Sequence, residues 1–162
     1  MNARIAMTAI GVVMSALSLF AVELSTSADR VESPLRVNTI CGQSDSIRFD
    51  LIPAAVFTMP EVATIGLTEE QCKEQELEVR CLKSFYRANG KAVSMDETDG
   101  YCKVITGQDG AILGAHLMGA HASDLIHEIA VIIKMGGTLE QMQSVIHAHP
   151  TLSEVLQSAL HQ

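Results

Sequence analysis

A tight turn between two short apolar runs constrains the fold of this chain more than any other feature. Gln108-Asp109-Gly110 separates the run Tyr101–Thr106 from the run Ala111–Met118. The Asp-Gly pair favours the positive φ angles that a two-stranded hairpin needs at its turn. The two runs therefore predict an antiparallel hairpin with one solvated face and one covered face.

Two further segments ahead of this hairpin have the pattern of strands. Residues 53–67 contain short β-branched runs punctuated by Pro60 and Gly66, and residues 78–86 alternate in part between apolar and polar side chains. Both patterns are typical of strands. Ile47–Asp50 can begin an earlier strand, so we expect a meander of several antiparallel strands.

Short helices are marked by their capping residues. Thr68 is followed three residues later by Gln71, and this capping-box spacing predicts a short helix through about Glu76. Asn89-Gly90 favours a turn, although residues 91–95 are equally compatible with one helical turn.

The C-terminal third has the pattern of helices. Ser123 is the expected N-cap of a buried helix that Gly136-Gly137 ends, and Thr138 is the expected cap of another helix over residues 139–146. Strands that precede helices, instead of alternating with them, predict an α+β fold. We therefore expect an antiparallel sheet with helices packed on one face.

The stretch His147–Glu154 bends the chain before its last helix. Pro150 fixes its own φ angle and disfavours the α-helical region for His149. Proline is also well suited to the first position of a helix, because its missing N–H would be unpaired there in any case. We expect Pro150 to start a helix that runs to Leu160.

His149 and Glu154 are the candidate acid–base residues of this stretch. Glu154 follows His149 by about one turn, so its carboxylate can reach back to the imidazole. A carboxylate on one ring nitrogen fixes the tautomer and orients the ring, and it leaves the other nitrogen free to exchange a proton. The alternative is a histidine at a helix start beside an ordinary first-turn glutamate that the helix dipole favours.

The same stretch resembles the C-terminal signature of the flavin-dependent pyridine nucleotide-disulfide oxidoreductases, most closely the dihydrolipoamide dehydrogenases. Residues 52–70 are similar to that family's entry into its interface domain, and Gly114–Gly119 with Ala122–Ile126 resembles its strand-to-helix passage. Because several motifs occur in the family's order, residues 46–162 are identified as a dimerisation domain of such an enzyme.

This resemblance implies specific roles for the two candidate residues. In the family, the histidine that matches His149 is the acid–base of thiol–disulfide exchange, and the glutamate that matches Glu154 holds it. The domain delivers this histidine across a homodimer into the partner's active site. His147 also matches the family's pattern, and we interpret it as structural, with Glu128 as a possible bonding partner of this loop.

FAD and NAD are the cofactors that the resemblance implies, yet the sequence offers a binding site for neither. It has no G-x-G-x-x-G motif after a strand and no closely spaced cysteine pair that could form a redox disulfide. We therefore expect the isolated chain to be inactive. It would act with chains that carry FAD and NAD domains. The alternatives are a non-catalytic dimerisation module, a truncated gene product, or a relative such as glutathione reductase.

Residues 1–45 do not match the family and form an apolar segment followed by a polar linker. Arg4 precedes the uncharged run Ile5–Val22, an outline typical of a signal peptide or a short membrane helix. A second interpretation is a truncated reading frame with a scrambled insert, because residues 2–4 and 38–42 each resemble separate family segments. A new buried helix is the third. A membrane is a partner only if the apolar run is a real anchor.

Charge and cysteine usage exclude several other functions. The net charge of −8 and the absence of tryptophan argue against a nucleic-acid partner. The four cysteines have no C-x-x-C spacing, and neither they nor the histidines are spaced as metal ligands. We interpret the cysteines as free packing residues in a reducing compartment, which favours a cytoplasmic location.

Overall fold

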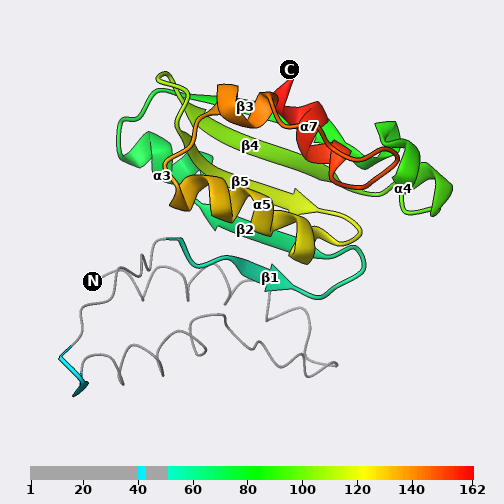
Figure 1. Cartoon of the computed structure of the whole chain (residues 1–162), viewed down its shortest axis with the longest axis horizontal. Coiled ribbons are helices and arrows are strands. Elements are labelled where there is room, and N and C mark those ends of the chain that lie inside the picture. The colour runs from blue at the N-terminus through cyan, green and yellow to red at the C-terminus, as the bar shows by residue number, and fades with distance from the viewer. Residues whose placement is uncertain (1–39, 43–50) are drawn as a thin grey trace.

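Residues 40–42 and 51–162 are described by the computed structural model, and their strands form one five-stranded sheet (Figure 1). Every neighbouring pair is antiparallel, in the order β1-β2-β5-β4-β3. The strands are β1 (Ala54–Val56), β2 (Val62–Gly66), β3 (Val79–Phe85), β4 (Tyr101–Gly107) and β5 (Ile112–Met118). The hairpin predicted at Asp109-Gly110 is confirmed, since it joins β4 to β5 and Gly110 has a φ of +81°.

Two helices cover one face of this sheet. α5 (Ala122–Lys134) packs on β5 and β2, and α7 (Glu154–Leu160) packs on β3 and β4. The short α6 (Leu139–Gln143) contacts α7. The predicted α+β fold, with an antiparallel sheet and helices on one face, is therefore confirmed.

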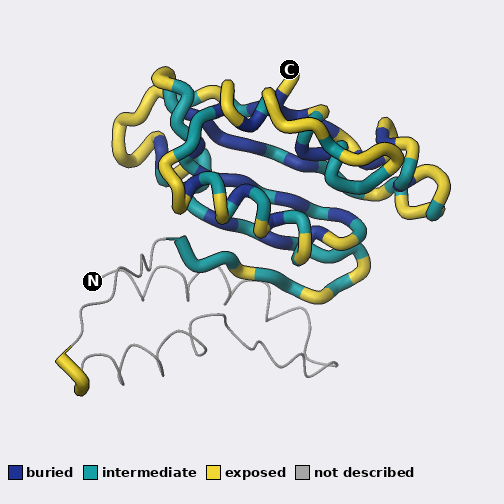
Figure 2. Tube along the Cα trace, in the orientation of Figure 1, coloured by how far each residue is buried: buried dark blue, intermediate teal, exposed yellow. Residues whose placement is uncertain are grey.

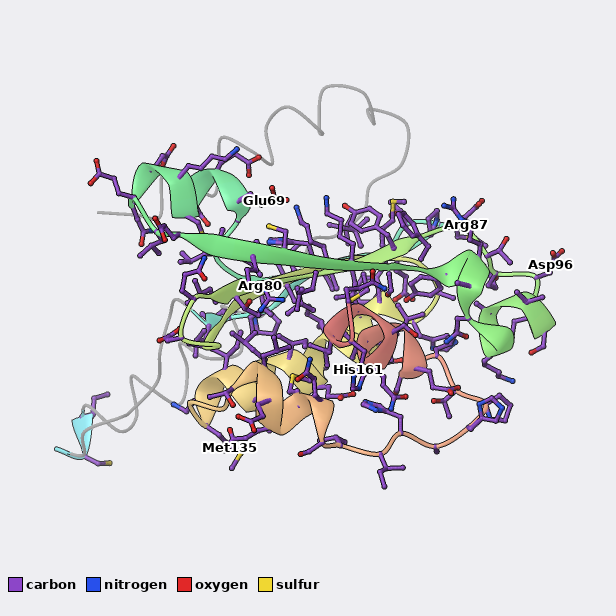
Figure 3. All side chains as sticks on the ribbon, turned by 90° about the horizontal axis from the view of Figure 1, so that it is seen from above. Glu69, Arg80, Arg87, Asp96, Met135 and His161 are labelled. Carbon is purple, nitrogen blue, oxygen red and sulfur yellow. The ribbon has the colours of Figure 1, made fainter. Side chains whose placement is uncertain are left out.

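Three shorter elements lie at the margins of the sheet. The 3₁₀ turn η2 (Tyr86–Ala88) leads directly into α4 (Gly90–Ser94), so a helical turn follows Asn89. α3 (Glu69–Glu74) lies on the side of the sheet opposite α5 and α7 (Figure 3). The capping box predicted for α3 is present, because Thr68 and Gln71 exchange backbone-to-side-chain hydrogen bonds of 2.9 and 3.1 Å.

The core lies between the sheet and the two covering helices. Figure 2 shows buried positions along the central strands and on the inner sides of the helices. Removing these apolar side chains from water is the main force that holds the layers together. The core includes Ala63, Ile65, Leu82, Val104, Leu117, Ile126, Ile129 and Leu156. Ser84 Oγ also donates a 2.6 Å hydrogen bond to the Val155 carbonyl, which ties the start of α7 to β3.

The prediction that Ser123 caps α5 is wrong. The N-cap is His121, which has a φ of 57° and makes no capping hydrogen bond with its side chain. The acceptor comes from Glu61, whose Oε2 receives both the Ser123 N–H at 3.0 Å and the Ser123 hydroxyl at 2.7 Å. A carboxylate placed at this helix end satisfies an unpaired N–H and suits the helix dipole.

Two predictions concern residues outside the described ranges: the strand start at 47–50 and the apolar run 5–22. Among the helices that the structure describes, none is long and apolar enough to cross a membrane.

Candidate acid–base site

The candidate residues lie on the loop between α6 and α7. The His149–Pro150 peptide bond in this loop is cis. α7 begins at Glu154, so the prediction that Pro150 is the first residue of the last helix is wrong. The carbonyl of Thr151 accepts the side-chain amide of Asn89, and the Val155 N–H bonds to the Leu152 carbonyl, so Thr151 does not take part in a helical hydrogen bond.

The predicted contact between His149 and Glu154 is present. His149 Nδ1 lies 2.8 Å from Glu154 Oε1. The imidazole is 79% exposed, whereas the carboxylate is 23% exposed. Because the carboxylate only accepts hydrogen bonds, Nδ1 carries the proton in this pair. His149 Nε2 makes no hydrogen bond to any described residue, so it is open to an outside group.

The second oxygen of Glu154 is also bonded. Glu154 Oε2 accepts the Thr151 N–H at 2.8 Å. This backbone hydrogen bond, and next the bond to His149, lower the pKa of the Glu154 carboxyl below its usual range, because both favour its charged form. Glu154 is therefore ionised at neutral pH and can stabilise positive charge on the imidazole.

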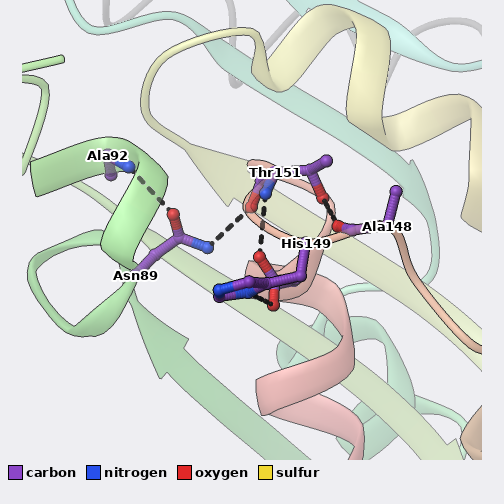
Figure 4. Close-up of polar contacts among 6 residues, drawn as sticks. Asn89, Ala92, Ala148, His149 and Thr151 are labelled. Carbon is purple, nitrogen blue, oxygen red and sulfur yellow. Dashed lines mark hydrogen bonds and ion pairs between the residues drawn. The ribbon is translucent and has the colours of Figure 1, made fainter. Parts of the chain in front are cut away.

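Thr151 connects this pair to the rest of the fold (Figure 4). Its hydroxyl donates to the Ala148 carbonyl at 2.7 Å, and its own carbonyl accepts the side-chain amide of Asn89 at 3.1 Å. Sequence reasoning assigned Asn89 only to a turn. Asparagine is a favoured N-cap residue, and this preference predicts its bond to the Ala92 N–H. The preference does not predict the second bond, to the Thr151 carbonyl.

His147 has a structural position, as predicted. Its side chain is 5% exposed, and its Nε2 lies 2.8 Å from Glu128 Oε1 on α5. The bond that was considered between Glu128 and the loop is thus present. His147 Nδ1 has no hydrogen-bond partner among the described residues.

Among the described residues, the other histidines form no second site. His116 Nε2 contacts the Leu67 carbonyl at 3.1 Å, and burial lowers the pKa of this histidine. His121 pairs with Asp124 at the surface. In the part of the chain that the structure describes, no three His, Cys, Asp or Glu residues are grouped to hold a metal.

All four cysteines are free, and the three in the folded domain, Cys72, Cys81 and Cys102, are poorly suited to nucleophilic chemistry. Burial raises the pKa of the Cys102 thiol to about 12, and burial also raises the pKa of Cys72 and of Cys81. A thiolate is the reactive species, so these shifts suppress reactivity. None of these three thiols is therefore suited to react with the help of His149.

The turn between β5 and α5 resembles a phosphate-binding turn, because the strand leads through Gly119 into the N-terminus of a helix. However, Glu61 already supplies an anion to that helix end. A Cβ built on Gly119 would lie 2.4 Å from the Tyr86 ring, so this chain fills the space beside the glycine. The turn therefore does not fit a phosphate group of FAD or NAD.

Comparisons with known proteins agree with the fold and its organisation. Residues 52–160 match the family model of the pyridine nucleotide-disulphide oxidoreductase dimerisation domain. The chain is 43% identical over 129 residues to a dihydrolipoyl dehydrogenase of Bacillus subtilis, covering 79% of this chain and 27% of that protein. It is 45% identical over 128 residues to a dihydrolipoyl dehydrogenase of Synechocystis, covering 76% of this chain and 27% of that protein. The chain thus spans about a quarter of the length of these relatives.

Solved structures show the same fold. LpdA from Mycobacterium tuberculosis aligns with a TM-score of 0.74 at 24% identity, covering 81% of this chain and 29% of that one. The HOCl-induced flavoprotein disulfide reductase RclA from Escherichia coli also aligns with a TM-score of 0.74, at 23% identity, covering 81% of this chain and 31% of that one. At these identities the likeness concerns the fold alone.

Proposed function

The chain belongs to the dimerisation-domain family of the pyridine nucleotide-disulphide oxidoreductases, and from this membership we propose that it supplies His149 and Glu154 as an acid–base pair to a dihydrolipoyl dehydrogenase-like flavoenzyme. The 2.8 Å contact between His149 Nδ1 and Glu154 Oε1 carries this proposal, because it leaves His149 Nε2 open to an outside group.

Proton transfer at Nε2 is the step that these residues perform. Neutral His149 accepts the proton of a dihydrolipoyl thiol at Nε2, and the thiolate that remains is the species that attacks a disulfide. Glu154 keeps the ring in the required tautomer and stabilises the imidazolium that forms. The imidazolium later returns its proton to a leaving thiolate, which restores the neutral ring.

FAD and NAD are the cofactors that the family and the similar dihydrolipoyl dehydrogenases imply. They supply the redox chemistry from domains that the described residues do not include. A visible spectrum of the purified chain with added FAD tests this division of labour. We expect no protein-bound flavin band, and such a band would show that the chain has a flavin site of its own.

The proposal also includes a homodimer. Exposed apolar side chains on α5 and on the loop that follows α6 support a self-association surface. The exposed imidazole of His149 would be accessible to a thiol site that lies outside its own subunit. A purely non-catalytic dimerisation module is the second candidate, and it is supported by the same apolar side chains. A cytoplasmic location stays a prediction.

The two candidates differ in a mixing experiment. The chain is combined with a piece of the Bacillus subtilis dihydrolipoyl dehydrogenase that lacks its own dimerisation domain, and NADH formation from dihydrolipoamide and NAD⁺ is measured. We expect activity that His149→Gln lowers by about 10²-fold or more, as for loss of an acid–base group. His161→Gln removes another exposed histidine and is the control. Equal rates for wild type and His149→Gln, or no activity at all, would contradict the acid–base role and favour the non-catalytic dimerisation module.

A further inference from the structure

Asn89 is a buried polar residue that links α4 to the loop of the candidate site. Its Oδ1 accepts the N–H of Ala92 at 2.9 Å and thereby caps α4. Its Nδ2 donates to the carbonyl of Thr151 at 3.1 Å, a residue 62 positions later in the chain. One amide thus serves two elements that are distant in the sequence (Figure 4).

The orientation of this amide is fixed by its two partners. Ala92 presents an N–H and needs an acceptor, whereas Thr151 presents a carbonyl and needs a donor. Turning the amide over would place donor against donor and acceptor against acceptor. Asparagine is therefore matched to this position by both ends of its side chain.

The bond from Asn89 ends on the residue that holds Glu154. The Thr151 N–H binds Glu154 Oε2 at 2.8 Å, and Glu154 Oε1 lies 2.8 Å from His149 Nδ1. The backbone torsions of Thr151 relate the direction of its carbonyl to that of its N–H. Fixing the carbonyl therefore limits where Glu154 and the ring of His149 can lie.

We propose that Asn89 is a positioning residue, which fixes the tautomer and orientation of His149 through Thr151 and Glu154. The value of Asn89 for catalysis rests on the function proposed above. Its effect on the His149 ring is independent of that function, because all the hydrogen bonds involved lie within this chain.

Two substitutions separate positioning from helix capping. Asn89→Asp keeps an oxygen that can cap α4, but it places a second carboxylate oxygen against the Thr151 carbonyl. Asn89→Ser also keeps a good capping residue, carries no charge, and is too short to reach Thr151. Thr68→Ala is the matched control, because it removes the capping box of α3 on the other side of the sheet.

The readout is the nitrogen NMR spectrum of the histidine rings in the full 162-residue chain, with His149→Gln used to assign the signals of His149. At about pH 9, where an ordinary imidazole is neutral, the wild type should show the Nδ1–H tautomer. Both Asn89 variants should lower the ratio of Nδ1–H to Nε2–H by about fivefold, the effect of one typical hydrogen bond. Thr68→Ala should leave the ratio unchanged.

An unchanged ratio in a folded Asn89 variant would overturn the proposal. Should neither variant fold, exchange of the Asn89 side-chain amide protons with solvent is measured in the wild type. Slow exchange is expected for a buried and bonded amide. Exchange as fast as that of an exposed asparagine would contradict the proposal.

These outcomes are distinguishable from a failure of the proposed function. In the mixing assay, loss of positioning should lower kcat and leave KM unchanged, because Asn89 acts on the acid–base pair and not on substrate binding. A mixture without activity, together with a shifted tautomer ratio, would support the positioning role and contradict only the enzymatic one.

Discussion

The imidazole Nε2 of His147 lies 2.8 Å from Glu128 Oε1, which joins the loop of the candidate site to a helix 19 residues earlier in the chain. Two residues further on, His149 binds Glu154 of α7. The short stretch is thus held by carboxylates from two different helices. The imidazole of His147 is buried in its pair with Glu128, whereas that of His149 is exposed in its pair with Glu154.

Glu128→Ala should destabilise the fold, because it removes the partner of a buried imidazole. Nδ1 of His147 already has no partner among the described residues, so neither ring nitrogen would be bonded. An unsatisfied buried polar group costs about 1–3 kcal/mol. Urea unfolding measures this loss as a lower midpoint. Glu128→Gln keeps a hydrogen-bond acceptor and should lose less stability than Glu128→Ala. Equal urea midpoints for Glu128→Ala and Glu128→Gln would contradict this account.

Acid should weaken the contribution of Glu154 to stability. Its pKa in the folded chain lies below the ordinary value of 4.5, so the unfolded chain binds the proton first as the pH falls. The contribution is therefore complete above about pH 4.5 and is lost as the pH falls through the folded-state pKa.

The matched comparison is wild type against Glu154→Gln, with unfolding free energies measured from neutral pH to about pH 3. The wild type should be the more stable protein at neutral pH, and the difference should shrink on acidification. Other carboxyls, such as that of Glu69, are common to both proteins and cancel. A difference that is constant or grows toward low pH would contradict the assignment.

The sequence was sufficient where the determining contacts are local. The Asp109-Gly110 hairpin, the Thr68 capping box and the contact between His149 and Glu154 depend on residues at most a few positions apart. The hairpin follows from a turn preference and the capping box from a preference at helix starts. The short spacing places Glu154 within reach of His149, although the helix begins at Glu154 and not at Pro150.

The sequence was insufficient where a distant residue supplies the partner. Ser123 is a good capping residue by itself, yet Glu61, 62 positions earlier, provides the acceptor. Pro150 is well suited to begin a helix, yet Thr151 is bonded to Asn89, also 62 positions earlier. Only the folded sheet brings these partners together, so no local pattern could have predicted them.

Glu61→Ala should destabilise α5, because it removes the acceptor of two hydrogen bonds from Ser123. Loss of a helix cap costs about 1 kcal/mol, and thermal unfolding should show a Tm lower by several degrees. Glu61 and Glu97 line one surface pocket, so Glu97→Ala removes a nearby exposed carboxylate and serves as the control. Equal Tm values for the two variants would show that Glu61 does not cap the helix.

Gly119→Ala should be among the most damaging single-methyl additions. A Cβ there would lie 2.4 Å from the buried Tyr86 ring, and the φ of +148° is unfavourable for any residue with a side chain. Overpacking and backbone strain together should cost about 3 kcal/mol. Gly90→Ala adds the same methyl where nothing lies within 4 Å and should be nearly neutral. Denaturant midpoints within error of each other would contradict this prediction.

Self-association should depend on the outer side of the helical layer. Val131 on α5 and Met135, the C-cap residue of α5, are four positions apart and are 58% and 78% exposed, and Ile146 is exposed on the loop that follows α6. Figure 3 shows Met135 on the side of α5 away from the sheet. An isologous interface typically buries about 800 Å² on each partner and has an apolar centre, and these side chains suit that position.

Val131→Asp should therefore turn a dimer into a monomer, because two copies of the new carboxylate would be buried near the symmetry axis without a partner. Light scattering at high micromolar concentration measures the mass directly. Leu77→Asp places the same charge at an exposed apolar residue just after α3, the helix that lies opposite α5 and α7, and should leave the dimer intact. A wild-type chain that is already monomeric at this concentration would refute the homodimer, and disruption by Leu77→Asp alone would place the interface on the other face.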